Sequence, residues 1–132
     1  PEDILESNRL ILDDLKHDIR GVVEDETSIQ GRVSIGEKTK IKRGALIRGP
    51  VIVGESTTIE GRVYIGPYTS IGNNVVIKRG EIENSIIMSN CYIDVGEKIT
   101  DSLIGPHSTI TTNQSGPKGR KFIIGESSII TL

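Results

Sequence analysis

An isoleucine or valine recurs at every sixth residue from Val23 to Ile77, and this period is what most restricts the fold. The series runs without a gap through Val23, Ile29, Ile35, Ile41, Ile47, Val53, Ile59, Ile65, Ile71 and Ile77. Because six is a multiple of two, all these anchor side chains point to the same side of an extended chain. Six is not a multiple of 3.6, so a helix would distribute them around its circumference. The period therefore predicts strands.

A second series of small or β-branched residues follows four residues after each anchor. Its members are Thr27, Val33, Thr39, Ala45, Val51, Thr57, Val63, Thr69 and Val75, and only Glu81 interrupts it. All glycines between Ile29 and Ile82 fall one to three residues after an anchor. Glycine there permits turn conformations that other residues resist. Each hexad is therefore predicted to be a short strand followed by a corner.

Three hexads would close one triangular coil, and successive coils would stack as parallel strands about 4.8 Å apart. Gly36, Gly54 and Gly72 lie one such coil apart, and the IKRG of Ile41–Gly44 returns two coils later at Ile77–Gly80. Burial of one isoleucine contributes roughly 1.5–3 kcal/mol, whereas ordering each residue costs about 1–2 kcal/mol. A single hexad is therefore unstable, and stacking is required.

After Ile77 the spacing changes but the pattern persists. IENSIIMSNCYI at Ile82–Ile93 aligns with ITDSLIGPHSTI at Ile99–Ile110, an offset of 17 residues, which indicates that one corner of each coil is shortened. A polar loop containing Gly and Pro follows over 112–121, and we assign it no role. Ile124 anchors a last hexad, so the final coil is predicted to be incomplete.

The first residues carry a different period. Ile4, Leu5, Ile11, Leu12, Leu15 and Ile19 form one apolar stripe of helical spacing, which predicts a linker helix over 1–20 before a solenoid over 21–132. Pro1 and two acidic residues suit a first helical turn, so an N-cap residue would precede them. We interpret the chain as part of a larger protein, the alternative being a processed native terminus. We expect the helix to pack at or near the first coil.

Composition excludes several classes of protein. The net charge of -2 and the pI near 5.7 do not favour nucleic acid or an anionic membrane as a partner. No apolar run approaches the roughly 20 residues that span a bilayer. The single cysteine, Cys91, cannot form an internal disulfide, which fits a reducing, cytoplasmic location.

The hexads IGEKTK, VGESTT and IGPYTS resemble the left-handed parallel β-helix of hexapeptide-repeat proteins. The left hand comes from this resemblance, since the general rule for parallel crossovers predicts the right hand. The fold class that we expect is an all-β solenoid, a left-handed parallel β-helix of five to six coils with a short N-terminal α-helix.

The leader PEDILESNRLILDD, the repeated SIIM and SLIG, and the closing FIIGESSIITL are similar to the C-terminal domains of sugar-1-phosphate nucleotidylyltransferases. The similarity is greatest to the long form of glucose-1-phosphate thymidylyltransferase. It implies an N-terminal nucleotidyltransferase domain as partner, which with Mg²⁺ makes dTDP-glucose from dTTP and glucose 1-phosphate. It also implies an assembly, scaffold or regulatory role for this chain in a homo-oligomer, either a trimer or a dimer. We therefore assign no catalytic, cofactor-binding or metal-binding residue here.

Three side chains are candidates for a chemical role. His107, in IGPHSTI, would be the general base if the chain were an acyltransferase that uses acetyl-CoA, but an exposed corner histidine is favoured. His17 is expected late in the helix, where its charge suits the helix dipole. Cys91 occupies the small inward position and is expected in the core. A zinc site of the three-histidine kind is disfavoured, because the chain has two histidines.

The basic side chains give a weaker signal. Lys42 and Arg43 repeat in phase as Lys78 and Arg79, within a set that also holds Lys38, Lys40 and Arg48. They are expected to form a solvated face, with an acidic partner or a phosphate as the alternative. Asn73 and Asn74 predict a corner with left-handed backbone. Asp13/Asp14 and Glu24/Asp25/Glu26 are expected to be solvated caps.

Overall fold

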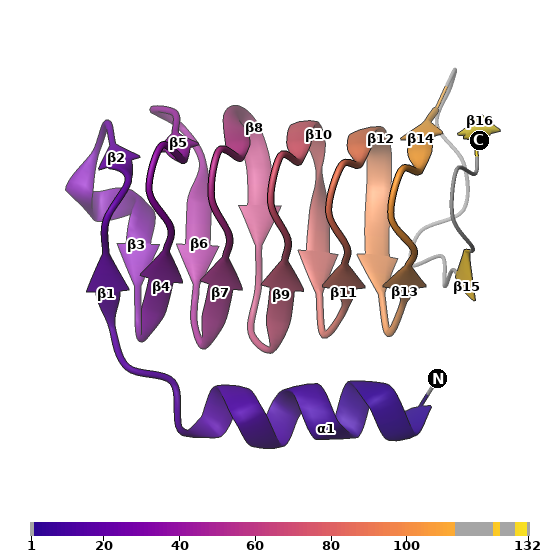
Figure 1. Cartoon of the computed structure of the whole chain (residues 1–132). Helices are drawn as coiled ribbons and strands as arrows, with labels where there is room; N and C mark the ends of the chain where they lie inside the picture. The colour runs from indigo at the N-terminus through magenta and orange to yellow at the C-terminus, as the bar shows by residue number, and fades with distance from the viewer. Residues whose placement is uncertain (1, 113–122, 125–128, 132) are drawn as a thin grey trace.

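The computed structural model, which describes residues 2–112, 123–124 and 129–131, shows one helix followed by a solenoid of parallel strands (Figure 1). The strands stack into about six coils. In Figure 1 the chain runs upward along the near face and downward behind it while it advances from left to right, which is a left-handed winding. The predicted left-handed β-helix of five to six coils is confirmed.

The solenoid has three faces. The helix α1 spans Glu2–Asp13, and a short 3-10 helix, η1, spans Glu26–Ser28. The first face consists of β1 (Asp18–Ile19), β4 (Val33–Ile35), β7 (Val51–Val53), β9 (Thr69–Ile71), β11 (Ile86–Ile87), β13 (Leu103–Ile104) and β15 (Ile123–Ile124). The second consists of β2 (Val22–Val23), β5 (Lys40–Ile41), the first halves of β8 (Thr58–Ile65), β10 (Val76–Glu83) and β12 (Tyr92–Thr100), then β14 (Thr109–Thr111) and β16 (Ile129–Thr131). The third consists of β3 (Ile29–Gln30), β6 (Leu46–Arg48) and the second halves of β8, β10 and β12.

The anchors stack directly on one another and form the core. On the second face Ile41, Ile59, Ile77, Ile93 and Ile110 are consecutive register partners, and all five are fully buried. The first and third faces carry equivalent columns, Ile35–Val53–Ile71–Ile87–Ile104 and Ile47–Ile65–Ile82–Ile99. The pairs Ile82–Ile99 and Ile93–Ile110 confirm the offset predicted for the later coils.

The corners explain the small residues and the glycines. Thr39 and Thr57 are fully buried, and their hydroxyls donate to the carbonyls of Gly54 (2.6 Å) and Gly72 (2.9 Å) in the next coil. A Cβ on Gly36 would lie 2.7 Å from the carbonyl carbon and oxygen of Gly54, so only glycine fits there. Asn74 has φ of 55°, which confirms the left-handed corner predicted from the two asparagines.

The helix is shorter than predicted. It ends at Asp13, and Ile19 lies in β1, where it pairs with Ile35 of the next coil. The guanidinium of Arg32 donates to the carbonyl oxygens of Asp13 (2.7 Å) and Leu15 (3.0 Å), so a side chain of the solenoid satisfies carbonyls at the helix end. The apolar stripe therefore combined helix residues with the first strand of the solenoid.

The expectation that the helix packs at or near the first coil is wrong. Figure 1 shows α1 lying across the coils along one corner of the solenoid, with its N-terminus beside the later coils. Asn8 is largely buried there, donating to the carbonyl of Tyr68 (3.1 Å) and accepting from the hydroxyl of Ser70 (2.5 Å). Arg9 lies over the Tyr68 ring at 3.9 Å and donates to Asn84 (3.1 Å). That the helix links the solenoid to a preceding domain stays a prediction.

Candidate functional site

The two histidines and the cysteine lie in three different environments. His107 is exposed at a corner with φ of 60°, as expected. His17 lies beyond the end of α1, not within it, and its Nδ1 accepts from the backbone N–H of Val33 at 3.1 Å. Cys91 is buried in the core, its thiol is 3.2 Å from the carbonyl oxygen of Gly105, and burial raises its pKa. Its predicted core position is confirmed.

Within the described parts of the chain, no group of three or more His, Cys, Asp or Glu side chains is arranged to hold a metal ion. In the same parts, no helix is both long and apolar enough to cross a membrane. The loop predicted over 112–121 lies outside the described residues except for Thr112.

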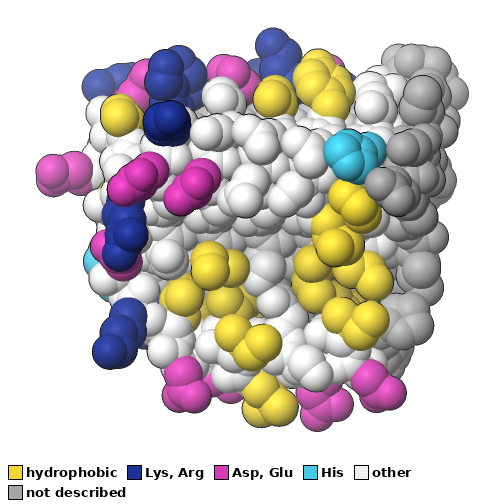
Figure 2. Space-filling view, in the orientation of Figure 1, with side chains coloured by type: hydrophobic (Ala, Val, Ile, Leu, Met, Phe, Trp, Pro, Cys, Tyr) yellow, Lys and Arg dark blue, Asp and Glu magenta, His cyan; other side chains and the backbone are white. Residues whose placement is uncertain are grey.

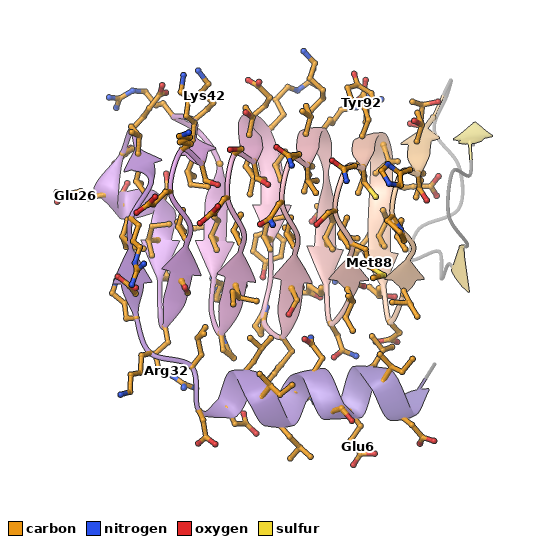
Figure 3. The ribbon with its side chains drawn as sticks, viewed as in Figure 1. Glu6, Glu26, Arg32, Lys42, Met88 and Tyr92 are labelled. Carbon is orange, nitrogen blue, oxygen red and sulfur yellow. The ribbon has the colours of Figure 1, made fainter. Side chains whose placement is uncertain are left out.

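The corner between the second and third faces, called here the second corner, carries a ladder of alternating charge. Glu24, Lys42, Glu60, Lys78 and Asp94 each follow directly after an anchor of the second face, and those anchors are register partners. The ammonium of Lys42, labelled in Figure 3, lies 3.8 Å from the Glu24 carboxylate. Glu24 and Lys42 thus lie side by side on neighbouring coils, whereas a register shift after Ile77 makes Arg79, and not Lys78, the partner of Asp94.

Glu24 and Asp25, two acidic residues of the first coil, make hydrogen bonds and ion pairs at the second corner. The backbone N–H of Arg43 donates to Glu24 at 2.8 Å, and this hydrogen bond lowers the Glu24 pKa. Asp25 is the N-cap of η1 and accepts from the N–H of Thr27 at 3.0 Å, which confirms its predicted capping role. The Arg43 guanidinium lies 3.8 Å from Asp25. Lys42 and Arg43 therefore each lie beside an acidic residue on the preceding coil.

A column of arginines lies next to this ladder, and one of its members was missed in the sequence. Arg79 pairs with Asp94 at 3.0 Å, and Arg62 is its register partner on the preceding coil. Arg62 is one residue out of phase with Arg43 and Arg79 in an 18-residue repeat. A register shift in β10 just before Arg79 brings the two arginines together. The available signal was the corner glycine beside each arginine: Gly44, Gly61 and Gly80.

The other members of the predicted basic set lie apart from one another. Lys38 is at another corner with φ of 63°, and Lys40 is exposed on the second face. Arg48 lies on the third face, where it donates to Gln30 at 3.3 Å. The structure therefore divides the set between separate corners and faces, and the second corner holds Lys42, Arg43, Lys78 and Arg79.

The third face carries a polar cluster of Tyr64, Glu83 and Lys98. The Lys98 ammonium lies 2.5 Å from one Glu83 oxygen, and the Tyr64 hydroxyl donates to the other at 3.1 Å. The hydrogen bond from Lys98 lowers the pKa of Glu83 and in turn raises the pKa of Lys98. Burial is the main cause that raises the pKa of Tyr64. The cluster connects three successive coils.

Replacing Lys98 with Met is expected to lower the free energy of unfolding by about 0.5–1 kcal/mol at pH 7. Because the Glu83 pKa is lowered in the folded chain, its contribution is present above the unfolded value of about 4.3 and is lost as pH falls through the folded pKa. Because the Lys98 pKa is raised in the folded chain, the contribution of Lys98 to stability is lost only as pH rises past about 10.4. Urea titrations at several pH values measure the free energy of unfolding of the original chain and of the Lys98→Met variant, with Lys40→Met as control. If the variant is still less stable than the original chain at pH 3, the ion pair with Glu83 is not the cause.

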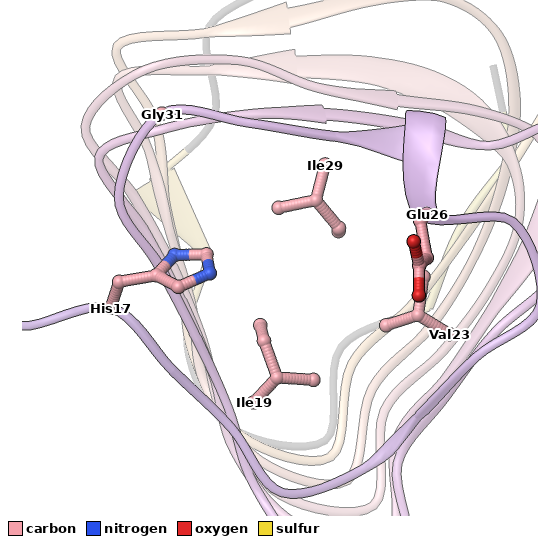
Figure 4. A pocket seen from close by; sticks show the side chains of 6 residues that line it. All are labelled: His17, Ile19, Val23, Glu26, Ile29 and Gly31. Atoms are coloured by element: carbon pink, nitrogen blue, oxygen red, sulfur yellow. The ribbon is translucent and has the colours of Figure 1, made fainter.

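The first coil leaves an open apolar end. A hollow of about 610 Å³ is lined by His17, Ile19, Val23, Glu26, Ile29 and Gly31, and Figure 4 shows Ile19, Val23 and Ile29 inside the triangular coil.

Apolar side chains also gather on the first face of the solenoid (Figure 2). There Ile52, Ile86 and Leu103 are half-buried, and Met88 is 43% exposed.

Comparison with known proteins gives one family and several relatives. The family model described as "GMPPB C-terminal domain" matches residues 47–128. A "Glucose-1-phosphate thymidylyltransferase" of Streptomyces antibioticus is 35% identical over 98% of this chain and 36% of the relative. The "Low-salt glycan biosynthesis nucleotidyltransferase Agl11" of Haloferax volcanii is 38% identical over all of this chain and 37% of its own length. A Streptomyces griseus "Glucose-1-phosphate thymidylyltransferase" is 31% identical over 96% of this chain and 35% of the relative. The chain thus spans little more than a third of these relatives.

Proposed function

Because this chain belongs to the GMPPB C-terminal domain family, we propose that it is the C-terminal β-helix of a nucleotidylyltransferase that makes dTDP-glucose from dTTP and glucose 1-phosphate. The observation that carries the proposal is the extent of the similarity, which reaches 98% of the chain in a relative named for this thymidylyl transfer. A shared solenoid alone would be weaker support, since hexapeptide repeats serve many functions.

In this proposal the β-helix is an assembly and scaffold element, and the chemistry belongs to a preceding nucleotidyltransferase domain with its Mg²⁺. Within the described residues, no group of three or more His, Cys, Asp or Glu side chains could hold a metal ion. The flat first face, with Ile52, Ile86 and Leu103 half-buried, suits packing against another subunit in a trimer or dimer. A cytoplasmic location is part of the same proposal.

The test compares the complete gene product with the 132-residue chain. Pyrophosphate release is measured with Mg²⁺, glucose 1-phosphate and each nucleoside triphosphate in turn, and light scattering gives the mass of both proteins. We expect activity with dTTP for the complete product, none for the chain alone, and a trimer or dimer for both. Activity of the isolated chain, or a complete product that does not use dTTP, would overturn the proposal.

Calorimetry with acetyl-CoA tests the acyltransferase alternative. The exposed corner position of His107 does not favour that function, so we expect no heat of binding to the chain. Micromolar affinity would show that the β-helix is more than a scaffold, and a His107→Ala variant would then show whether this histidine lies at the site.

A further inference from the structure

Two adjoining hollows at the second corner share the side chains of Arg62 and Arg79. The larger, of about 410 Å³, is also lined by Glu60, Gly61, Lys78 and Asp94. The smaller, of about 230 Å³, is also lined by Gly80, Glu81, Val95, Gly96 and Glu97. The larger volume is within the range of about 300–1,000 Å³ found for small-molecule sites. Three cations (Arg62, Lys78 and Arg79) and three glycines (Gly61, Gly80 and Gly96) thus line this stretch of surface.

Arg79 is held in place by its neighbours. Its Nε donates to Asp94 at 3.0 Å, and its Nη2 donates to the hydroxyl of Thr112 at 3.3 Å. That hydroxyl also accepts from the N–H of Gly96 at 2.8 Å. A Cβ on Gly96 would lie 3.4 Å from Nη1 of Arg79, so the missing side chain leaves space beside that nitrogen. The guanidinium is therefore oriented before any ligand binds, and its Nη1 faces the smaller hollow.

Arg62 differs from the other arginines of the column. Arg43 and Arg79 each have an acidic partner, but within the described residues no carboxylate lies within 4.0 Å of Arg62. Its register partner is Arg79, so two guanidinium groups stand on adjacent strands. Like charges directly opposite in a sheet are destabilising, and an anion between them would relieve the repulsion. Paired arginines also match the oxygens of a phosphate group.

The carboxylates that line the two hollows indicate which class of ligand could bind there. Glu60 lines the larger hollow, Glu81 and the buried Glu97 line the smaller, and Asp94 is already used by Arg79. A site for phosphate alone would gain nothing from acidic groups beside it, whereas sugar hydroxyls donate hydrogen bonds to carboxylates. We propose that the two hollows bind a sugar phosphate, with its phosphate between Arg62 and Arg79 and its hydroxyls at Glu60. This site is independent of the proposed function, because it uses only residues of this chain.

The test is calorimetry on the 132-residue chain with glucose 1-phosphate, orthophosphate and glucose as separate probes. We expect submillimolar affinity for glucose 1-phosphate, weaker binding of orthophosphate and none of glucose. Arg62→Gln is expected to weaken glucose 1-phosphate binding more than about 10-fold, the loss typical of a hydrogen bond to a charged group. It should leave the thermal midpoint unchanged, since Arg62 makes no ion pair within the described residues. Arg48→Gln, on the third face, is the matched control.

A second variant separates the sugar from its phosphate. Glu60→Gln is expected to weaken the binding of glucose 1-phosphate and to leave or strengthen that of orthophosphate. Absence of binding by both phosphates, or affinity that Arg62→Gln does not change, would overturn the site. Equal affinity for orthophosphate and glucose 1-phosphate would overturn the sugar assignment. No outcome depends on nucleotidyl transfer, so failure here is distinguishable from failure of the proposed function.

Discussion

Replacing Ile59 with Ala is expected to lower the free energy of unfolding by about 4 kcal/mol. Ile59 is fully buried in the middle of the second-face column, between Ile41 and Ile77. The coils above and below are held at strand spacing by backbone hydrogen bonds on three faces, so they cannot collapse into the space that the smaller side chain leaves. In a solenoid each coil also stabilises both of its neighbours, and this substitution weakens both interfaces.

Urea unfolding followed by circular dichroism measures this effect. The matched control is Val22→Ala, because Val22 lies on the same second face in β2 but is 58% exposed. We expect the control to change the free energy of unfolding by less than about 1 kcal/mol. Similar losses in the two variants would mean that the inward columns do not form the core.

Replacing Leu12 with Ala is expected to release the helix from the solenoid. Leu12 is fully buried, although it lies only one residue from the end of α1. Truncation of such a leucine costs about 2–5 kcal/mol, which exceeds the roughly 1 kcal/mol of any one polar contact of the helix and leaves Leu5 as its other buried leucine. An isolated helix of this length is marginal in water, so α1 should unfold once it is detached while the coils remain folded.

Amide hydrogen exchange, read separately for α1 and for the strands, distinguishes this local effect from global unfolding. Ile11→Ala is the control, because Ile11 is the adjacent residue and is 69% exposed. The control should leave exchange in α1 unchanged. Equal loss of helix protection in both variants would contradict the observed helix face, and loss of protection throughout the strands would show that the solenoid depends on the helix.

These two predictions differ in how far the sequence anticipates them. The inward position of Ile59 follows from the six-residue period alone. The sequence placed Ile11 and Leu12 in one apolar stripe, and only the packed structure shows that Leu12 is covered and Ile11 is not. The stripe also included Ile19, which belongs to β1. A run of apolar residues cannot distinguish the end of a helix from the start of a first short strand.

The second corner also contains a residue whose position the sequence does not predict. Lys42, Arg43, Lys78 and Arg79 were recognised because they repeat in phase, but Arg62 was not. Its position beside Arg79 depends on a register shift within β10, and a shift of one residue in one strand has no reliable mark in the sequence. The sequence predicts His17 within the helix, whereas its environment depends on where the helix ends, which is at Asp13.

The sequence by itself determined the solenoid, its buried columns and its corners, because every coil imposes the same local demands for an inward apolar residue, a small residue and a turn. Only the tertiary structure decided the path of α1 across the coils and the meeting of Arg62 with Arg79. Both depend on how separate segments come together in space: the helix follows a corner that offers Tyr68, Ser70 and Asn84, and the arginines meet through the stacking of one coil on the next.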